Sequence, residues 1–283
     1  MKVVITGAAG LVARHFALRL VHHHEVLALR RADLDVTDRV AVARLIGDFQ
    51  PNLLINGAVT QVDQAEEDPA RCWSVNAAAP EILAQAVEGA GAEMVHFGTQ
   101  YVFSGEPVGR APYTVADQPQ PVNEYGRSKL AGEEAVQRSC ARSYVIRTAW
   151  VYGSGKNSFL CTVHDDLKAG KVVRAIDDIW SNTTYVADLI DRCLEILQRR
   201  VYGTYHVINQ GVCTYYDFAL AAANLAGLSR EQIDGLIEIT HERDMKRAAA
   251  RPRYTTLRCL LSEQLGLAPM RPWQAALAAY VRA

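Results

Sequence analysis

Short apolar runs, rich in β-branched residues, alternate with longer segments of helical periodicity through the first half of the chain. The runs predict strands at Lys2–Thr6, Glu25–Leu29, Asn52–Asn56, Met94–Gly98 and Tyr144–Arg147. Helices are predicted between them at Leu11–His22, Thr37–Phe49, Ala70–Gly89 and Asn123–Ser139. Strands that alternate with helices form βαβ units with right-handed crossovers, so we expect an α/β fold with a doubly wound parallel sheet covered on both faces.

The pattern loosens after Val151. Helices are predicted at Ser158–Ala169, Ala187–Arg199, Tyr216–Ala226 and Pro272–Val281, and short strands at Val172–Ala175, Tyr205–Ile208 and Ile237–Thr240. We therefore predict a first domain over residues 1–150 and a smaller C-terminal lobe over residues 151–283, with a segment near 180–210 returning to the first domain. The one long loop, Glu106–Asn123, contains four prolines, and a loop of that length is often functional.

The composition of the chain argues against several kinds of binding partner. The chain carries 30 basic and 31 acidic residues, so it has no global field for nucleic acid or an anionic membrane. Its six cysteines form no C-x-x-C pair, which argues against a zinc or redox motif, and no apolar run reaches the ~18 residues of a membrane span. We expect a cytoplasmic protein, monomeric or homodimeric, without a metal.

A glycine turn joins the first strand to the first helix. Gly7 and Gly10 give the spacing G-x-x-G-x-x-A, with Ala13 facing the strand. Glycine allows a tight turn and lets backbone N–H groups at a helix start approach a pyrophosphate. The turn therefore predicts a Rossmann-like dinucleotide site; an ordinary tight βα turn is the competing interpretation.

The end of the second predicted strand bears on cofactor choice. Arg30 and Arg31 stand where an acidic residue would hold the ribose hydroxyls of NAD. Arginine can pair with a 2′-phosphate, which favours NADPH, although NADH stays open. The arginines can also lie in solvent, with Asp33 or Asp35 serving the ribose.

A tyrosine and a lysine lie four residues apart on the helix predicted from Asn123. That spacing places Tyr125 and Lys129 on one face, and a nearby ammonium should lower the pKa of the phenol. Such a tyrosine can pass a proton to a carbonyl oxygen while hydride reaches its carbon. Thr99 ends a buried strand upstream, where its hydroxyl can hold the same oxygen. Without these companions the Y-x-x-x-K pattern would fit a surface helix.

Together these motifs resemble the dTDP-4-dehydrorhamnose reductase family of the extended short-chain dehydrogenases. The resemblance rests on the glycine turn and on seven further stretches along the whole chain: Ala65-Glu66, Val75–Ala77, Thr99–Phe103, Tyr125–Lys129, Arg147–Gly153, Asp177-Asp178 and Arg251-Pro252. It implies a Rossmann domain, a C-terminal substrate-binding lobe and NAD(P)H-dependent reduction of a 4-keto-6-deoxy sugar nucleotide.

The resemblance also implies roles for single residues. The catalytic residues would be Thr99, Tyr125 and Lys129, and the sugar would contact Thr99, Gln100 and Trp150. The resemblance implies cofactor contacts from Gly10, Leu11, Val12, Asp35, Val36, Ala58, Val59, Thr60, Tyr125 and Lys129. The patterns described above add Gly7, Arg30 and Arg31 to this set. The family usually has aspartate at the place of Gln100, which leaves the sugar open, and often an acidic residue at the place of Arg30.

Two other functions share this framework. A sugar-nucleotide 4-epimerase uses the same tyrosine and lysine but keeps its cofactor. A non-catalytic regulatory subunit, like the methionine adenosyltransferase β subunit, resembles the same family. A dehydratase is disfavoured, because relatives of that type place Asp-Glu where Gln100-Tyr101 stand.

Three further features have two interpretations each. The run His22–His24 suggests a metal site, but consecutive residues at a helix end point in different directions and fit a solvated terminus better. Trp150 either stacks on the substrate or fills the core beneath Tyr152. A late basic cluster is either a solvated face or a clamp for the substrate diphosphate, with Arg251 as its substrate-binding member; it comprises Lys246, Arg247, Arg251, Arg253 and Arg258.

Overall fold

A six-stranded parallel sheet forms the centre of the larger part of the molecule. The structure is a computed structural model that describes residues 1–283. Its strand order is β10-β5-β4-β3-β1-β2. The strands are β1 Lys2–Thr6, β2 Glu25–Leu29, β3 Leu53–Asn56, β4 Glu93–Thr99, β5 Ser143–Thr148 and β10 Gly203–His206. The predicted doubly wound sheet is confirmed, and the five strands predicted in the first half lie within two residues of their expected bounds.

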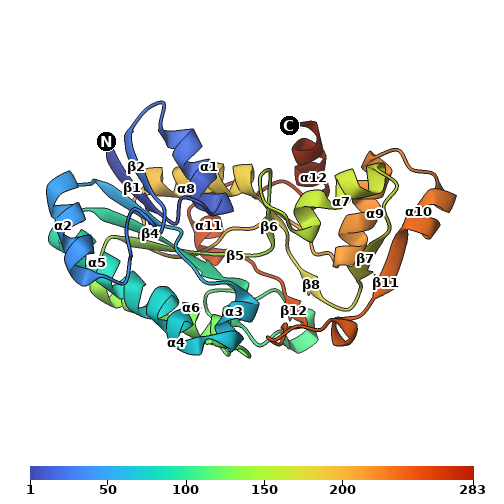
Figure 1. Ribbon diagram of the computed structural model, residues 1–283, viewed down its shortest axis with the longest axis horizontal. Helices are drawn as coiled ribbons and strands as arrows, with labels where there is room; N and C mark the ends of the chain where they lie inside the picture. Colours follow the sequence, from blue (N-terminus) through green and yellow to red (C-terminus); the bar gives the residue numbers. More distant parts are fainter.

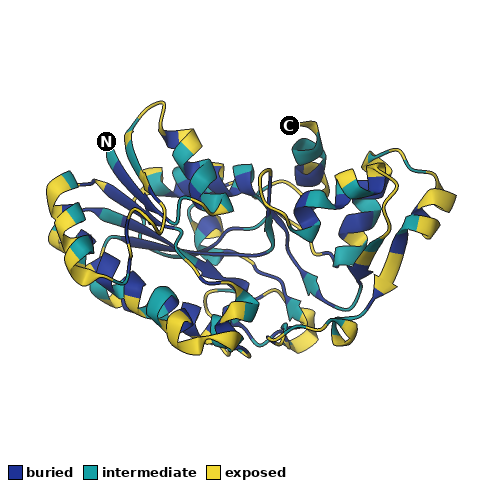
Figure 2. Cartoon of the chain, viewed as in Figure 1, coloured by how far each residue is buried: buried dark blue, intermediate teal, exposed yellow.

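Helices cover both faces of this sheet (Figure 1). The layer on one face consists of α1 Leu11–Leu20 and α8 Val186–Arg199, and the layer on the other of α2 Arg39–Phe49, α5 Ala79–Gly89 and α6 Glu124–Ser139. Val3 and Ile5 pack toward the first layer, whereas Val4 packs toward the second. Because both faces are buried, β1 is apolar at successive positions. Figure 2 shows the central strands of the sheet mostly dark blue, whereas the edge strand β2 is mostly intermediate or exposed.

The helix predicted at Ala70–Gly89 is interrupted, which corrects the expectation of one regular helix. The chain forms α4 Pro69–Trp73, then a π-helical turn at Ser74–Ala78, then α5. Asn76 lies in that turn, fully buried, and its side-chain amide donates to the hydroxyls of Thr60 and Ser128. A π turn re-aims one side chain within a helix, and here it aims Asn76 at these two partners. The short helix α3 Val62–Glu67 was not predicted.

The second part of the molecule packs four helices around a two-stranded parallel sheet, on the right of Figure 1. Its elements are α7 Phe159–Lys168, α9 Tyr215–Leu225, α10 Arg230–Leu236, α12 Trp273–Arg282, β7 Val173–Ile176 and β11 Ile237–Thr240. They enclose a separate core that includes Tyr152, Phe218 and Trp273. Helix α10 and the short α11 Leu260–Gln264 were not predicted.

The chain returns to the large sheet between these elements. Helix α8 packs on α1, and β10 pairs with β5 at the edge of the sheet. Two short strand pairs connect the parts: β6 Val151–Tyr152 with β9 Thr184–Tyr185, and β8 Trp180–Ser181 with β12 Tyr254–Thr255. The division into residues 1–150 and 151–283 stays a prediction. None of the helices has the length and apolar character that a bilayer crossing requires.

Candidate active site

The strand order reverses between β1 and β3, and the glycine turn lies at that point. Ligands of open α/β sheets bind at the carboxyl ends of the strands beside such a reversal. Gly7 has a φ of +67°, and a Cβ there would come within 2.5 Å of the Gly57 carbonyl group. Ala13 is buried against Gly57, as predicted. Gly10 precedes α1 without a side-chain cap, so the N–H groups of the first turn, including those of Leu11 and Val12, have no side-chain partner there.

The residues after β3 differ in how far their polar groups are already hydrogen-bonded within the protein. Ala58 donates its backbone N–H to the Asn56 side-chain oxygen at 3.1 Å. Val59 is 50% exposed, so it presents apolar surface beside the glycine turn. Thr60 is buried: its N–H donates to the Asn76 oxygen at 3.0 Å, and its hydroxyl accepts from the Asn76 amide at 2.9 Å. Thr60 therefore shapes the loop, and its polar groups are already bonded within the protein.

The end of β2 lies beside the glycine turn, because Ala8 donates its N–H to the Leu29 carbonyl at 3.0 Å. Arg30 and Arg31 follow directly and are exposed. The Asp33 carboxylate accepts from the Arg30 N–H at 2.8 Å and from its Nε at 3.3 Å. These bonds hold the pKa of Asp33 below its usual value.

Asp35 and Val36, which follow in the chain, also interact with residues near them. Asp35 accepts from the hydroxyl and the N–H of Thr37, and these bonds lower the pKa of Asp35. Val36 packs into the core between α2 and α5, which leaves its backbone as the part available near an adenine.

Two local features fix the start of helix α6 and the position of Tyr125 on it. Asn123 caps the helix, accepting from the Gly126 N–H at 2.7 Å, as the predicted helix start requires. A Cβ on Gly126 would lie 2.2 Å from the Tyr101 carbonyl oxygen, so glycine lets α6 pack against the end of β4. This close packing sets the ring of Tyr125 edge-on to that of Tyr101, with centroids 6.1 Å apart.

The structure corrects the expected pKa of Tyr125. Burial raises the pKa of its phenol, the neighbouring Tyr101 adds to the rise, and the Thr99 hydroxyl opposes it. The Lys129 side chain extends toward β4, and burial decides the direction of the Tyr125 shift. The phenol is therefore held protonated, which is the form that a general acid needs.

Lys129 is itself buried, with 2% exposure. Its Nζ lies 3.4 Å from His96 Nε2. Burial lowers the pKa of Lys129 to about 8, although Glu133 and Cys72 act in the opposite direction. One turn further along α6, Glu133 pairs with Arg147 of β5 at 2.8 Å in a buried ion pair.

Thr99 and Gln100 lie at the carboxyl end of β4, both buried. The Thr99 hydroxyl accepts from the Tyr101 N–H at 3.2 Å and donates to the Gln100 side-chain oxygen at 3.2 Å. The predicted placement of a hydroxyl beside Tyr125 thus agrees with the structure. Gln100 is an uncharged neighbour of that hydroxyl.

Trp150 follows β5 with a left-handed φ of 37°, a conformation that a bulky residue adopts only under constraint. Its ring lies on that of Tyr215, with centroids 4.1 Å apart, at the margin of the second core. It is half-buried rather than enclosed beneath Tyr152.

The members of the basic cluster have separate partners and do not form a single face. Arg251 is only 9% exposed in its side chain and pairs with Asp63 of α3 at 2.7 Å. Arg247 pairs with Glu242, and Arg258 with Glu263. Arg253 lies over the Trp180 ring, and Lys246 is exposed.

Sequence reasoning missed the residues that hold these candidates in place. Asp63 fixes Arg251 across 188 positions, and Asn123 donates to the Ala250 carbonyl at 2.8 Å while capping α6. His96 lies fully buried beneath Lys129. The asparagine cap left a sequence signal at the helix start, whereas the other two pairings left none.

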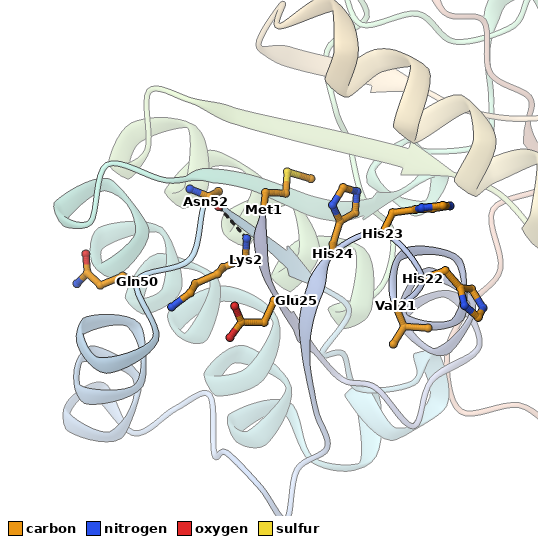
Figure 3. Close-up of a pocket in the computed structure, with 9 residues that line it drawn as sticks. All are labelled: Met1, Lys2, Val21, His22, His23, His24, Glu25, Gln50 and Asn52. Atoms are coloured by element: carbon orange, nitrogen blue, oxygen red, sulfur yellow. Dashed lines mark hydrogen bonds between the residues drawn. The ribbon is translucent and has the colours of Figure 1, made fainter.

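The histidine run lies away from this site. An open surface hollow of about 650 Å³ is lined by His22–His24 together with Met1, Lys2, Glu25 and Asn52, at the amino ends of the strands. In Figure 3 the ring of His22 points away from those of His23 and His24, as expected of consecutive residues at a helix end. A separate trio, Asp177, Asp178 and His241, has its ligand atoms within 4.8 Å of one another. Two of its members are bonded together, since His241 Nδ1 lies 2.7 Å from the Asp177 carboxylate.

Comparison with known proteins gives relatives over the full length. The dTDP-4-dehydrorhamnose reductase of Mycolicibacterium smegmatis is 39% identical over 280 residues, which cover 98% of this chain and 84% of that protein. The spore coat polysaccharide biosynthesis protein SpsK of Bacillus subtilis is 32% identical over 283 residues, covering 99% and 97%.

A solved structure of a protein with the same name as the first relative also matches this chain over nearly its full length. The dTDP-4-dehydrorhamnose reductase of Bacillus anthracis, solved in complex with NADP, matches with a TM-score of 0.92 at 29% identity, covering 99% of this chain and 98% of that one. The model of the family described as the RmlD substrate binding domain matches residues 1–283. The chain therefore belongs to the RmlD substrate-binding-domain family.

Proposed function

We propose that this protein reduces the keto group of a 4-keto-6-deoxy sugar nucleotide with NADPH as hydride donor. The observation that carries the proposal is the position of Tyr125. Its half-buried phenol lies beside the Thr99 hydroxyl at the carboxyl edge of the sheet. A bound nicotinamide would supply the hydride there.

The chain's own residues supply the proton and the orientation. Thr99 and Tyr125 both present hydroxyls at the end of β4. A keto oxygen can accept from Tyr125, and from Thr99 once its hydroxyl turns away from Gln100. Tyr125 would give its proton to that oxygen, because burial keeps the phenol protonated until the oxygen becomes charged. Lys129, one turn below, would hold cofactor ribose hydroxyls.

The cofactor proposal rests on the end of β2. Arg30 is exposed beside the glycine turn and keeps most of its side-chain donors free, since Nε is the one guanidinium donor bonded to Asp33. A 2′-phosphate would find charged donors there, and the neighbouring Asp33 and Asp35 carboxylates already accept hydrogen bonds from Arg30 and Thr37. The NADP complex of the B. anthracis relative supports the same choice.

The substrate proposal rests on the relatives and on the far side of the site. Trp150 and Tyr215 provide aromatic surface, and Arg247 and Arg251 provide charge that acts on both Tyr101 and Tyr215. Arg251 would contact the diphosphate through donors that Asp63 leaves free. These residues come from both parts of the molecule, as expected for a substrate bound between them.

The proposal is tested by incubating the purified protein with NADPH and a panel of keto sugar nucleotides. We expect loss of NADPH absorbance with a 4-keto-6-deoxy sugar nucleotide, and a product whose C4 carries a new hydroxyl by NMR. Interconversion of 4-epimers without net NADPH consumption would replace this proposal with an epimerase. Absence of any sugar conversion, with cofactor bound, would favour a regulatory subunit.

A further inference from the structure

A row of buried polar side chains crosses the sheet and ends at Lys129. Thr6, Asn56 and His96 are register partners on the adjacent strands β1, β3 and β4. The Thr6 hydroxyl donates to Asn56 Oδ1 at 2.7 Å, Asn56 Nδ2 lies 3.1 Å from His96 Nδ1, and His96 Nε2 lies 3.4 Å from Lys129 Nζ. Each of the four residues is at most 2% exposed. Such a row is costly in a core unless every donor meets an acceptor.

The direction of this row is set at Asn56. The Ala58 backbone N–H, which can only donate, points at Asn56 Oδ1 from 3.1 Å. The amide oxygen must therefore face Ala58 and Thr6, and the amide nitrogen must face His96. His96 Nδ1 consequently accepts a hydrogen bond and carries no proton.

The proton of a neutral His96 then lies on Nε2, facing Lys129. A doubly protonated ring is disfavoured, because burial and the nearby Lys129 hold the pKa of His96 well below its usual value. An ammonium group and an Nε2–H are both donors and cannot bond to each other. A neutral lysine amine, in contrast, accepts from Nε2–H.

We propose that His96 is a positioning residue for Lys129, donating its Nε2–H to the neutral lysine amine and releasing that amine when it takes up a proton. A protonated Lys129 finds no acceptor at His96, so its N–H groups turn toward the crevice where Tyr125 lies. The catalytic importance of this proton uptake rests on the proposed function of Lys129. The hydrogen bond from His96 to Lys129 does not depend on that function.

The other groups around Lys129 bear on where it titrates. Glu133 on α6 and Cys72 on α4 raise the pKa of Lys129, while Arg147 on β5 neutralises Glu133 at 2.8 Å. Burial outweighs them and brings the pKa of Lys129 to about 8. The Lys129 side chain therefore gains or loses its proton near pH 8, within about one unit of neutral pH.

The first test needs no altered activity. In protein labelled with ¹⁵N-histidine, long-range ¹⁵N–¹H correlations show which ring nitrogen carries the proton. The His96 signal among the eight histidines is identified by its loss in His96→Gln. We expect a neutral ring with its proton on Nε2 at pH 9, where the Lys129 amine is neutral. A proton on Nδ1, or a doubly protonated ring, would overturn the proposal.

The second test uses Asn56→Asp to reverse the direction of the hydrogen bonds along the row. A carboxylate can only accept, so His96 must then place its proton on Nδ1, and Nε2 becomes an acceptor for a Lys129 ammonium. We expect Lys129 to stay charged to a pH at least one unit higher. The readouts are the lysine ¹³Cε shift, identified by its loss in Lys129→Met, and the alkaline limb of kcat/KM for NADPH, which reports ionisations of the free enzyme.

Two controls separate the tautomer from the added charge. Asn52→Asp places the same charge at the exposed start of β3 and should leave the Lys129 titration unmoved. Asn56→Asp should lose most of its effect in a His96→Leu background, because the tautomer can no longer transmit it. A shift that persists in full there would contradict the role of His96. If the chain lacked reductase activity, the NMR titrations would still decide the proposal.

Discussion

The catalytic face of α6 and the end of β2 border the same crevice but are built in opposite ways. Tyr125, Lys129 and Glu133 are fixed among buried partners, where burial shifts the pKa of each. Arg30 and Arg31 stand in solvent, with one exposed ion pair to Asp33. The contrast matches what each region has to do. A proton donor needs a fixed distance and a shifted pKa, whereas selection of a phosphate needs charge at an accessible edge.

This difference predicts unequal responses to substitution. Removing a group from the buried face changes desolvation, packing and several pKa values together. Removing an exposed charge loses only a screened attraction. The following four variants measure that inequality, in order of decreasing effect.

Tyr125→Phe should give the largest loss. Only the phenolic proton disappears, and general acid catalysis typically supplies ~10²–10⁴-fold in rate. NADPH affinity should stay within a few-fold of the original, as measured by fluorescence titration. Tyr144→Phe removes another buried hydroxyl, bonded to Glu93 at 3.1 Å, and should leave turnover intact. Unchanged turnover of Tyr125→Phe across the pH range would refute its role.

Arg147→Met should destabilise the fold by about 3–5 kcal/mol, because it leaves the Glu133 carboxylate buried and unpaired. Burial already raises the pKa of Glu133, and Arg147 limits that rise. Without Arg147 the deficit should be full at neutral pH and shrink as the pH falls through the folded-state pKa of Glu133, where the carboxyl becomes neutral. Urea denaturation at several pH values measures this.

The matched control is Arg127→Met, which breaks an Arg127–Glu124 pair of similar length, 2.7 Å, on the same helix but with Arg127 exposed. Its loss should cost less than about 1 kcal/mol. Equal costs for the two arginines would contradict the comparison of buried and exposed regions.

Lys129→Met should stabilise the protein while it impairs function. The folded-state pKa of Lys129, about 8, lies below its ordinary 10.5, so folding disfavours the charged form. Removing the group should add up to about 3 kcal/mol below pH 8, a gain that shrinks as the pH rises from 8 toward 10.5. Melting temperatures at pH 7 and pH 10 test this, and a variant that melts lower at both would disprove it. Turnover and cofactor affinity should both fall; a loss of affinity alone would restrict Lys129 to binding.

Arg30→Asp should have the smallest effect on the fold and act mainly on cofactor choice. One charged hydrogen bond to a 2′-phosphate contributes ~1.5–3 kcal/mol, or roughly 10–150-fold in affinity. The aspartate adds repulsion, so the preference should reverse toward NADH. Arg31→Asp should do less, since adjacent residues of an extended segment point to opposite sides. The ratios of kcat/KM for the two cofactors measure both, and equal use of NADH and NADPH by the unaltered protein would leave the arginines as surface charges.

Much of the site was predictable because its position follows from local pattern. The glycine turn, Thr99 and the Tyr125–Lys129 spacing all fall at strand ends or on one helix face, which periodicity and turn chemistry reveal within a dozen residues. Parallel strands then bring these ends to one edge of the sheet. The π turn at Ser74–Ala78 escaped prediction because it depends on where Asn76 finds its partners.

What the sequence determined by itself is the order of the five strands in the first half of the chain, the turn of Gly7 and Gly10, and the placing of a tyrosine and a lysine on one helix face. Only the tertiary structure decided how these groups are charged. The pKa of Tyr125 rises rather than falls, and Arg251 is held by Asp63 from 188 positions away. The reason is that periodicity is a property of neighbours along the chain, whereas burial and pairing depend on neighbours in space.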